Sequence, residues 1–115
     1  RDIGVTTVLD TELAAMTVRE AAERALAALE GDRPIHLSID LDVLPAAVAP
    51  GVSAPAGFGV EYATLRAMVE AVASTGRVAL LDVVELNPDF DVDNRTAKAA
   101  ARLIDDAVVG AKLRG

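Results

Sequence analysis

Acidic side chains at the ends of two predicted strands are the residues of this chain best suited to chemistry. Asp40 and Asp42 close a segment of alternating apolar and polar residues, and Glu85 closes a nearly continuous apolar segment. In open α/β sheets, ligands collect outside the carboxyl ends of the strands. Anions gathered at one edge repel each other unless a cation lies among them. Carboxylate oxygens suit Mg²⁺, Mn²⁺ or Ca²⁺, so the pattern favours a divalent metal site at this edge.

The spacing of Asp40 and Asp42 allows both carboxylates to reach one ion or to bridge two. Residues two apart on a strand point to the same side, with Cα atoms about 6.6 Å apart at roughly 3.3 Å per residue. The alternative is a solvated turn at a strand end that binds nothing. His36 lies on the same face but about 13 Å from Asp40, too far to share an ion. We therefore expect His36 to be a packed or hydrogen-bonded side chain beneath the site.

Glu85 and Asp82 lie three residues apart but call for different interpretations. Glu85 is either a solvated strand-end acid or an anion facing the same crevice, able to pair with a cationic substrate nitrogen. Asp82 lies inside the apolar run, where an unpaired charge is costly. We interpret Asp82 as structural and expect Arg95 or Arg77 as its partner.

Strands that alternate with helices must position these acids. Strands are predicted over residues 3–8, 35–42 and 78–84. This alternation predicts an α/β fold with a parallel sheet and right-handed crossovers. The continuous apolar character of the last strand is typical of a strand covered on both faces.

Three helices are predicted between and after the strands. One begins at Thr17, whose side chain can form a capping box with Glu20, and ends at Gly31. A second covers residues 61–74, and a third begins after Asn94 as its cap. The apolar stripe predicted for the third helix comprises Ala97, Ala100, Ala101, Ile104 and Val108.

A loop rich in proline and glycine follows Asp42. It runs over residues 43–59, which include Pro45, Pro50 and Pro55, so it cannot form regular structure. At about 17 residues it is longer than most connections, and long ordered loops tend to be functional. We expect this loop to shape the wall of a pocket.

Composition excludes several classes of function. The 115 residues suit one domain, and 18 acidic against 11 basic residues give a net charge of −7. This charge, with 3% aromatic residues, argues against nucleic-acid binding and polybasic membrane attachment. The chain has no cysteine, which excludes disulfides and thiolate zinc sites and is compatible with the cytoplasm. It begins with Arg1 rather than Met, so we expect a processed or truncated chain.

Two motifs resemble those of the ureohydrolases, the family of arginase, agmatinase and formimidoylglutamase. Ser38–Leu44, followed by Ala49–Gly51, resembles the second metal-ligand motif of that family, and Asp82–Pro88 is similar to a later motif. The loop Leu44–Pro55 looks most like the formimidoylglutamase branch. The resemblance covers residues 1–115 as the C-terminal portion of a single, longer ureohydrolase domain.

The resemblance implies a three-layer α/β/α fold and a site for two manganese ions. Asp40 would bridge the two ions, Asp42 would bind one of them, and Glu85 would contact a guanidine-like or formimino nitrogen of the substrate. The remaining ligands, two histidines and two aspartates, would come from motifs that precede this segment in the family. We therefore expect the isolated chain to be inactive.

The implied activity is hydrolysis of the C–N bond of N-formimidoyl-L-glutamate to glutamate and formamide, a step of histidine degradation. The resemblance also implies a small-molecule substrate, a cytoplasmic location and a homo-oligomer. One alternative is another ureohydrolase, acting on arginine, agmatine or a guanidino acid. Another is a non-catalytic fragment with an acidic, metal-binding loop.

Overall fold

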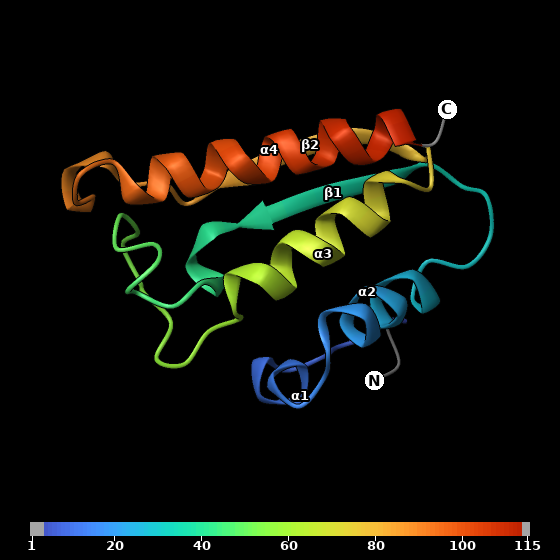
Figure 1. Cartoon of the computed structure of the whole chain (residues 1–115), viewed down its shortest axis with the longest axis horizontal. Helices are drawn as coiled ribbons and strands as arrows, with labels where there is room; N and C mark the ends of the chain where they lie inside the picture. The colour runs from blue at the N-terminus through green and yellow to red at the C-terminus, as the bar shows by residue number, and fades with distance from the viewer. Residues whose placement is uncertain (1–3, 114–115) are drawn as a thin grey trace.

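The computed structural model describes residues 4–113 of the chain (Figure 1). In this part, helices alternate with two parallel strands, in agreement with the predicted α/β class. None of the helices within residues 4–113 is both long and apolar enough to cross a membrane. The elements are α1 (Asp10–Ala14), α2 (Val18–Ala27), β1 (Ile35–Asp40), a 3₁₀ turn (Leu41–Val43), α3 (Tyr62–Ala73), β2 (Val78–Val84), a second 3₁₀ turn (Pro88–Phe90) and α4 (Arg95–Leu113).

The strands β1 and β2 form a parallel pair connected through α3. Ser38 lies opposite Asp82, and Asp40 lies opposite Val84. Both strands therefore reach their carboxyl ends at the same edge, where α3 and α4 also begin (Figure 1). This arrangement places the residues that follow the two strands in one region of the molecule.

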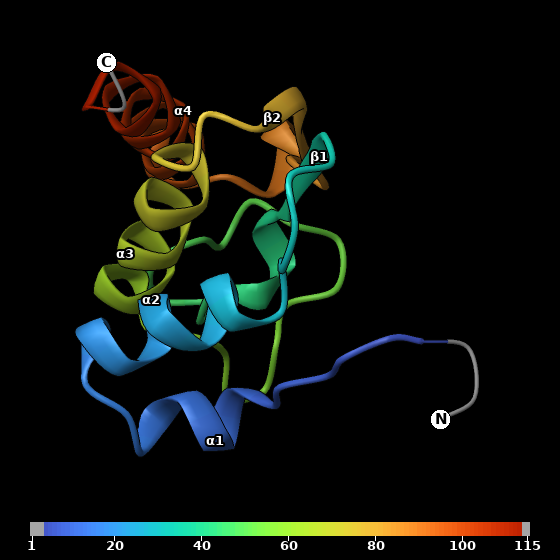
Figure 2. The ribbon, with the colours of Figure 1, turned by 90° about the vertical axis from the view of Figure 1, so that its right-hand side faces the viewer.

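One face of the sheet is closed by α3 and α4, which lie on the same side of the strands (Figure 2). Leu81 and Val83 of β2 pack against a core that includes Val69 of α3 and Leu103 of α4. Burying these side chains supplies most of the free energy that holds the layers together. The buried core cluster comprises Ile39, Leu41, Leu44, Ala49, Val52, Val69, Ala73, Ala100, Leu103 and Ala107.

The opposite face of the sheet is open in residues 4–113. Leu80 is 57% exposed and Val84 is 38% exposed. The prediction that β2 is covered on both faces is therefore wrong for this part of the chain. The physical reason is that α2 packs on α3 rather than on the open face. The described residues thus form two layers of the expected three-layer arrangement.

The segment before α1 does not form the predicted strand. Residues 4–9 have no regular structure, and Ile3 lies outside the described residues. A strand needs a neighbour that binds its amides and carbonyls, and this segment runs away from β1 and β2 (Figure 2). The apolar pattern also fails to predict α1, where the Glu12 carboxylate accepts a hydrogen bond from the Leu9 amide at 2.8 Å.

The predicted beginnings of α2 and α3 are confirmed. In α2, the Thr17 side chain accepts from the Glu20 amide at 3.1 Å, and the Glu20 carboxylate accepts from the Thr17 amide at 2.8 Å. This is the predicted capping box, although α2 ends at Ala27, before Gly31. The bounds of α3 agree with the prediction to within one residue at each end.

The start of α4 is held by Asp91 rather than by the predicted cap, Asn94. The Asp91 carboxylate accepts hydrogen bonds from the amides of Thr96 at 3.0 Å and Ala97 at 3.2 Å. A carboxylate at this end of a helix is also favoured by the helix dipole. The prediction of Asn94 as the capping side chain is therefore wrong.

The buried face of α4 differs from the predicted stripe. Ile104 and Val108 are exposed, whereas Leu103 is fully buried. The face of α4 that packs on α3 is the one that carries small residues. A Cβ at Gly110 would lie 2.7 Å from the carbonyl oxygen of Glu70, so the two helices approach closely at this glycine. Apolar periodicity does not identify this face, because α4 carries apolar residues on more than one side.

Candidate functional site

Strand β1 ends at Asp40, two residues earlier than predicted. The chain then forms the 3₁₀ turn Leu41–Val43, and the Asp40 carboxylate accepts a hydrogen bond from the Asp42 amide at 3.1 Å. Leu41 is fully buried in the core, so the backbone bends to bring that side chain inward. Asp40 and Asp42 are therefore joined by a turn and not by strand geometry, which corrects the argument from strand spacing.

The carboxylates of Asp40, Asp42 and Glu85 gather at the carboxyl edge of the sheet. Partial desolvation raises the pKa of Asp42, and so do a hydrogen bond with Asp40 and the negative charges of Asp40 and Glu85. Asp40 lies opposite Val84 in the sheet, so Glu85 follows β2 at the same edge where Asp40 and Asp42 lie. The register agrees with the predicted placement of the three acids at one edge, while their convergence on a metal ion and their roles stay predictions.

Glu85 has an unusual backbone conformation. It follows β2 directly and has a φ of 76°, in the left-handed region. A glutamate in this region costs free energy, and such strain tends to be found at functional sites. The turn directs the chain away from the strand immediately after Val84, so Glu85 lies at the edge rather than within the ladder.

The loop between β1 and α3 is irregular, as predicted, and it is anchored near the candidate site. The Gly51 amide donates to the Thr96 hydroxyl at 2.7 Å, and the Gly51 carbonyl accepts from the Asn87 amide at 2.7 Å. A Cβ at Gly51 would lie 2.8 Å from the Cβ of Asp91, so glycine is required there. These contacts hold the loop against the segment after Glu85. The sequence does not reveal them, because they join residues far apart in the chain.

Asp91 is a further residue whose part in organising this edge is not evident from the sequence. Burial alone would raise its pKa, but hydrogen bonds from Thr96, Ala97 and Val92 hold the pKa below its usual value. The carboxylate is therefore kept ionised while it anchors the first turn of α4. Asp91 lies four residues before Arg95, outside the position where a capping side chain is expected, so the sequence gives no specific signal for this cap.

His36 and Asp82 lie on the open face of the sheet, further from its carboxyl edge than Asp40. The Nε2–H of His36 donates to Oδ2 of Asp82 at 2.6 Å, and the Ser38 hydroxyl donates to Oδ1 at 2.5 Å. His36 is thus hydrogen-bonded, as predicted. The expected pairing of Asp82 with Arg77 or Arg95 is wrong, since Arg77 donates instead to the Arg33 carbonyl. Asp82 is not enclosed by apolar residues, because its face of the sheet is open.

The donor set of the candidate site suits a hard divalent cation but is incomplete. Asp40 and Asp42 present carboxylate oxygens, the ligands that Mn²⁺ and Mg²⁺ accept. Within residues 4–113, however, no three histidine, aspartate or glutamate side chains are arranged to hold a metal ion. The described residues therefore fit part of a manganese shell.

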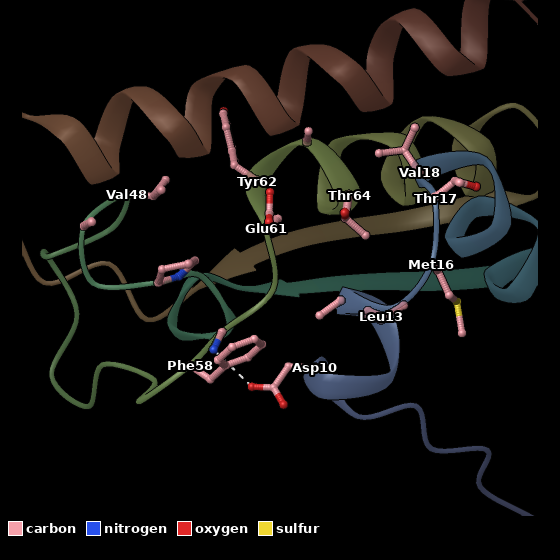
Figure 3. Close-up of a pocket in the computed structure, with 15 residues that line it drawn as sticks. Asp10, Leu13, Met16, Thr17, Val18, Val48, Phe58, Glu61, Tyr62 and Thr64 are labelled. Carbon is pink, nitrogen blue, oxygen red and sulfur yellow. Dashed lines mark hydrogen bonds between the residues drawn. The ribbon is translucent and has the colours of Figure 1, made fainter.

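A separate groove of about 740 Å³ lies between α1, the long loop and the start of α3 (Figure 3). Phe58 and Val48 of the loop and Leu13 of α1 line it, and Asp10 at its rim accepts a hydrogen bond from the Gly59 amide at 3.0 Å. The loop does shape a pocket wall, as predicted. Because the groove contains none of the three edge carboxylates, it is distinct from the candidate site.

Comparison with known proteins is consistent with this geometry. Residues 1–110 match the model of the Arginase family. The chain is 48% identical over 104 residues to formimidoylglutamase from Corynebacterium efficiens, covering 90% of this chain and 33% of that protein. It is 64% identical over 70 residues to formimidoylglutamase from Rhodococcus jostii, covering 61% of this chain and 22% of that protein. The chain thus spans a third or less of the length of these two relatives.

The fold has close counterparts among solved structures. A crystal structure of Trypanosoma cruzi formiminoglutamase with Mn²⁺ superimposes with a TM-score of 0.79 at 27% identity. That superposition covers 91% of this chain and 35% of the other. The predicted arginase-like α/β fold is therefore confirmed, and the described residues form part of it.

Proposed function

Because the chain belongs to the Arginase family, we propose that it is the C-terminal part of a metal-dependent hydrolase acting on N-formimidoyl-L-glutamate. In this proposal residues 1–115 are part of one domain, and the products are glutamate and formamide. The observation that carries it is the placement of Asp40, Asp42 and Glu85 at one edge of the sheet. The names of two relatives, formimidoylglutamases at 48% and 64% identity, support the choice of substrate.

Asp40 and Asp42 are the proposed metal ligands of this chain. In the whole enzyme, two Mn²⁺ ions would share Asp40, and Asp42 would hold one of them. Bound divalent cations lower the pKa of a coordinated water toward neutrality and so supply a nucleophile at physiological pH. The hydrogen bond from the Asp42 amide orients the Asp40 carboxylate, because it fixes one carboxylate oxygen and leaves the other available to a ligand.

Glu85 is the proposed substrate-binding and catalytic residue. The formimino group of the substrate is an amidine and carries a positive charge when protonated. A carboxylate binds such a group through charge-assisted hydrogen bonds, which are about twice as strong as neutral ones. Glu85 would hold the formimino nitrogen at the cationic end of the substrate and orient the amidine carbon toward the attacking oxygen. The left-handed backbone at Glu85 supports this role, since strain of that kind is retained where it positions a functional group.

A second candidate is another ureohydrolase activity, on arginine, agmatine or a guanidino acid. A guanidinium presents the same planar, cationic N–H groups to Glu85 as a formimino group does. The edge carboxylates alone therefore do not discriminate between these substrates. We favour formimidoylglutamate because of the relatives' names, and direct comparison of the substrates decides the question.

A non-catalytic fragment is the alternative for the chain in isolation. Within residues 4–113 the acidic edge lacks a third metal ligand, and metal affinity falls steeply when ligands are missing. We therefore expect no measurable hydrolysis from the purified 115-residue chain with Mn²⁺ added. Turnover of formimidoylglutamate by this chain alone would contradict the proposal that some of the metal ligands come from outside this chain.

The proposed function is tested with a chimeric enzyme. The segment of Corynebacterium efficiens formimidoylglutamase that matches this chain over 104 residues is replaced by the chain itself. We expect Mn²⁺-dependent release of formamide. Asp42→Ala should weaken this activity, and excess Mn²⁺ should partly restore it. A folded chimera that is inactive at every Mn²⁺ concentration would refute the proposed roles.

Substrate choice is tested by assaying the same chimera with formimidoylglutamate, arginine and agmatine. Hydrolysis of arginine or agmatine in preference to formimidoylglutamate would favour the second candidate. Assembly as a homo-oligomer and a cytoplasmic location stay predictions, and sedimentation of the chimera checks the first of these.

A further inference from the structure

Three polar side chains join β1 to β2 on the open face of the sheet. Asp82 of β2 accepts from the Ser38 hydroxyl on one carboxylate oxygen at 2.5 Å and from His36 on the other at 2.6 Å. His36 and Ser38 are two residues apart on β1, so both point to the same face. One carboxylate thus binds two successive same-face positions of the neighbouring strand. We call His36, Ser38 and Asp82 the cross-strand clamp.

The cross-strand clamp favours the observed register of the two strands. Ser38 lies directly opposite Asp82, and Asp40 lies two residues beyond Ser38. A slip of one residue would turn Asp82 toward the apolar core, because successive residues point to opposite faces. A slip of two residues in one direction would place Asp82 beside the Asp40 carboxylate, where like charges repel. The observed register satisfies both oxygens of Asp82.

The clamp adds little to stability as such. The side chains of His36 and Asp82 are 54% and 39% exposed, and exposed ion pairs contribute little to the free energy of folding. The pKa of Asp82 lies below its usual value because of the hydrogen bonds from Ser38 and His36, so the carboxylate is ionised when it forms these bonds. The buried face already constrains the register through its hydrophobic pattern, and the clamp adds a polar constraint that favours Ser38 opposite Asp82.

We propose that Asp82 is a positioning residue that sets the offset between the Asp40–Asp42 turn and Glu85. The same register that pairs Ser38 with Asp82 pairs Asp40 with Val84, so Glu85 follows directly at the edge. The clamp lies two residues before Asp40 on one strand and three before Glu85 on the other. The importance of this offset for catalysis rests on the proposed function, whereas the offset itself is a property of this chain.

The test uses amide resonances of the metal-free chain, measured by NMR. Asp82→Ala removes both bonds of the clamp, and Ser38→Ala removes one without changing any charge. We expect both variants to shift the Asp42 and Glu85 amide resonances, with the larger shift in Asp82→Ala. Asp82→Asn should restore most of the wild-type positions, because its amide can accept from Ser38 and donate to a neutral His36 nitrogen.

Two controls separate positioning from stability. Leu80→Ala changes an exposed residue of the same face and strand, and Leu103→Ala lowers stability from the core. Neither should move the Asp42 and Glu85 resonances under conditions where the chain remains folded. Unchanged resonances in Asp82→Ala, or equal shifts in Leu103→Ala, would overturn the proposal.

A titration with Mn²⁺ alone separates this inference from the proposed function. Mn²⁺ broadens the resonances of residues near it, so broadening at Asp40 and Asp42 reports metal binding at the edge. We expect Ser38→Ala to need at least twice the Mn²⁺ of the wild-type chain for equal broadening. If Mn²⁺ fails to broaden these resonances in the wild-type chain, the metal assignment fails, and the metal-free shifts still decide whether Asp82 positions the edge.

Discussion

The two faces of the β1–β2 sheet differ in what holds them. On the closed face, Leu81 and Val83 pack into a core formed with α3 and α4. On the open face, Leu80 and Val84 remain exposed beside the cross-strand clamp. In our proposal the closed face supplies most of the stability, and the clamp on the open face reinforces the register. Parallel sheets are almost always covered on both faces, so we expect the rest of the domain to cover the open face in a whole enzyme of this family.

The largest expected effect distinguishes the two faces directly. Leu103→Ala on the closed side should lower the free energy of unfolding by about 2–5 kcal/mol, because it leaves a cavity in a fully buried site. Leu80→Ala on the open face should change it by less than about 0.5 kcal/mol, as exposed substitutions do. Urea unfolding followed by circular dichroism measures both. Equal losses would mean that the open face is covered in solution, for example by a second copy of the chain.

The next largest effect is a loss of activity caused by substitutions at the carboxyl edge of the sheet. In the chimeric enzyme, Glu85→Gln should lower kcat/KM by about tenfold to somewhat over a hundredfold, because one charge-assisted bond contributes roughly 1.5–3 kcal/mol. Excess Mn²⁺ should not restore the rate, whereas it should partly restore the rate of Asp42→Ala. The measurement is an Mn²⁺ titration of activity for both variants. Full recovery of the Glu85 variant at high Mn²⁺ would make Glu85 a metal-site or folding residue.

The strained backbone at Glu85 predicts a smaller effect, a gain rather than a loss in the free energy of unfolding. Glu85→Gly in the isolated chain should raise the free energy of unfolding by up to about 1 kcal/mol, because glycine adopts positive φ without a steric penalty. The matched control is Glu61→Gly, whose φ of −57° gives no such relief. Thermal unfolding of the two variants compares them. Destabilisation by Glu85→Gly would show that the glutamate side chain makes contacts that outweigh the strain.

The sequence predicted the edge of the sheet better than its faces. Asp40 and Glu85 could be placed at one edge because the carboxyl ends of parallel strands coincide, a rule that needs only the order of elements. The end of β1 at Asp40 was not predictable, because burial of Leu41 bends the chain only when the core is present. The partners of Asp82 were missed for a similar reason, since the register of β1 against β2 brings Ser38 and His36 to it.

Some of the errors at the helices have the same physical origin. The buried face of α4 depends on its close approach to α3 at Gly110, which apolar periodicity does not encode. Residues 4–9 have strand-like composition but no neighbouring strand in the described part of the chain. Local signals such as the Thr17–Glu20 capping box were predicted correctly, because both partners lie within one turn. The face of α4 and the strand before α1 failed because they depend on distant partners, whereas the missed α1 and the cap by Asp91 are local errors.

The smallest expected effect is a pH dependence that originates on the open face. Hydrogen bonds from Ser38 and His36 lower the pKa of Asp82 in the folded chain. The unfolded chain therefore binds more protons than the folded chain in the acid range, and stability rises with pH there. The contribution of the clamp is fully present above the unfolded aspartate pKa of about 3.9. It is lost as the pH falls through the lower, folded pKa. Solvent screening of these exposed side chains keeps the effect small.

Urea unfolding of the wild-type chain and Asp82→Ala at pH 6 and at pH 2.5 measures this contribution. The difference between the two proteins should be larger at pH 6 and should shrink at pH 2.5. Asp32→Ala, which replaces an exposed aspartate outside the clamp, is the matched control and should give no such pattern. A difference between wild type and Asp82→Ala that stays constant across this range would mean that the clamp does not depend on ionised Asp82. In that case the two faces of the sheet would differ in exposure alone, and the register would have to be set from the closed face.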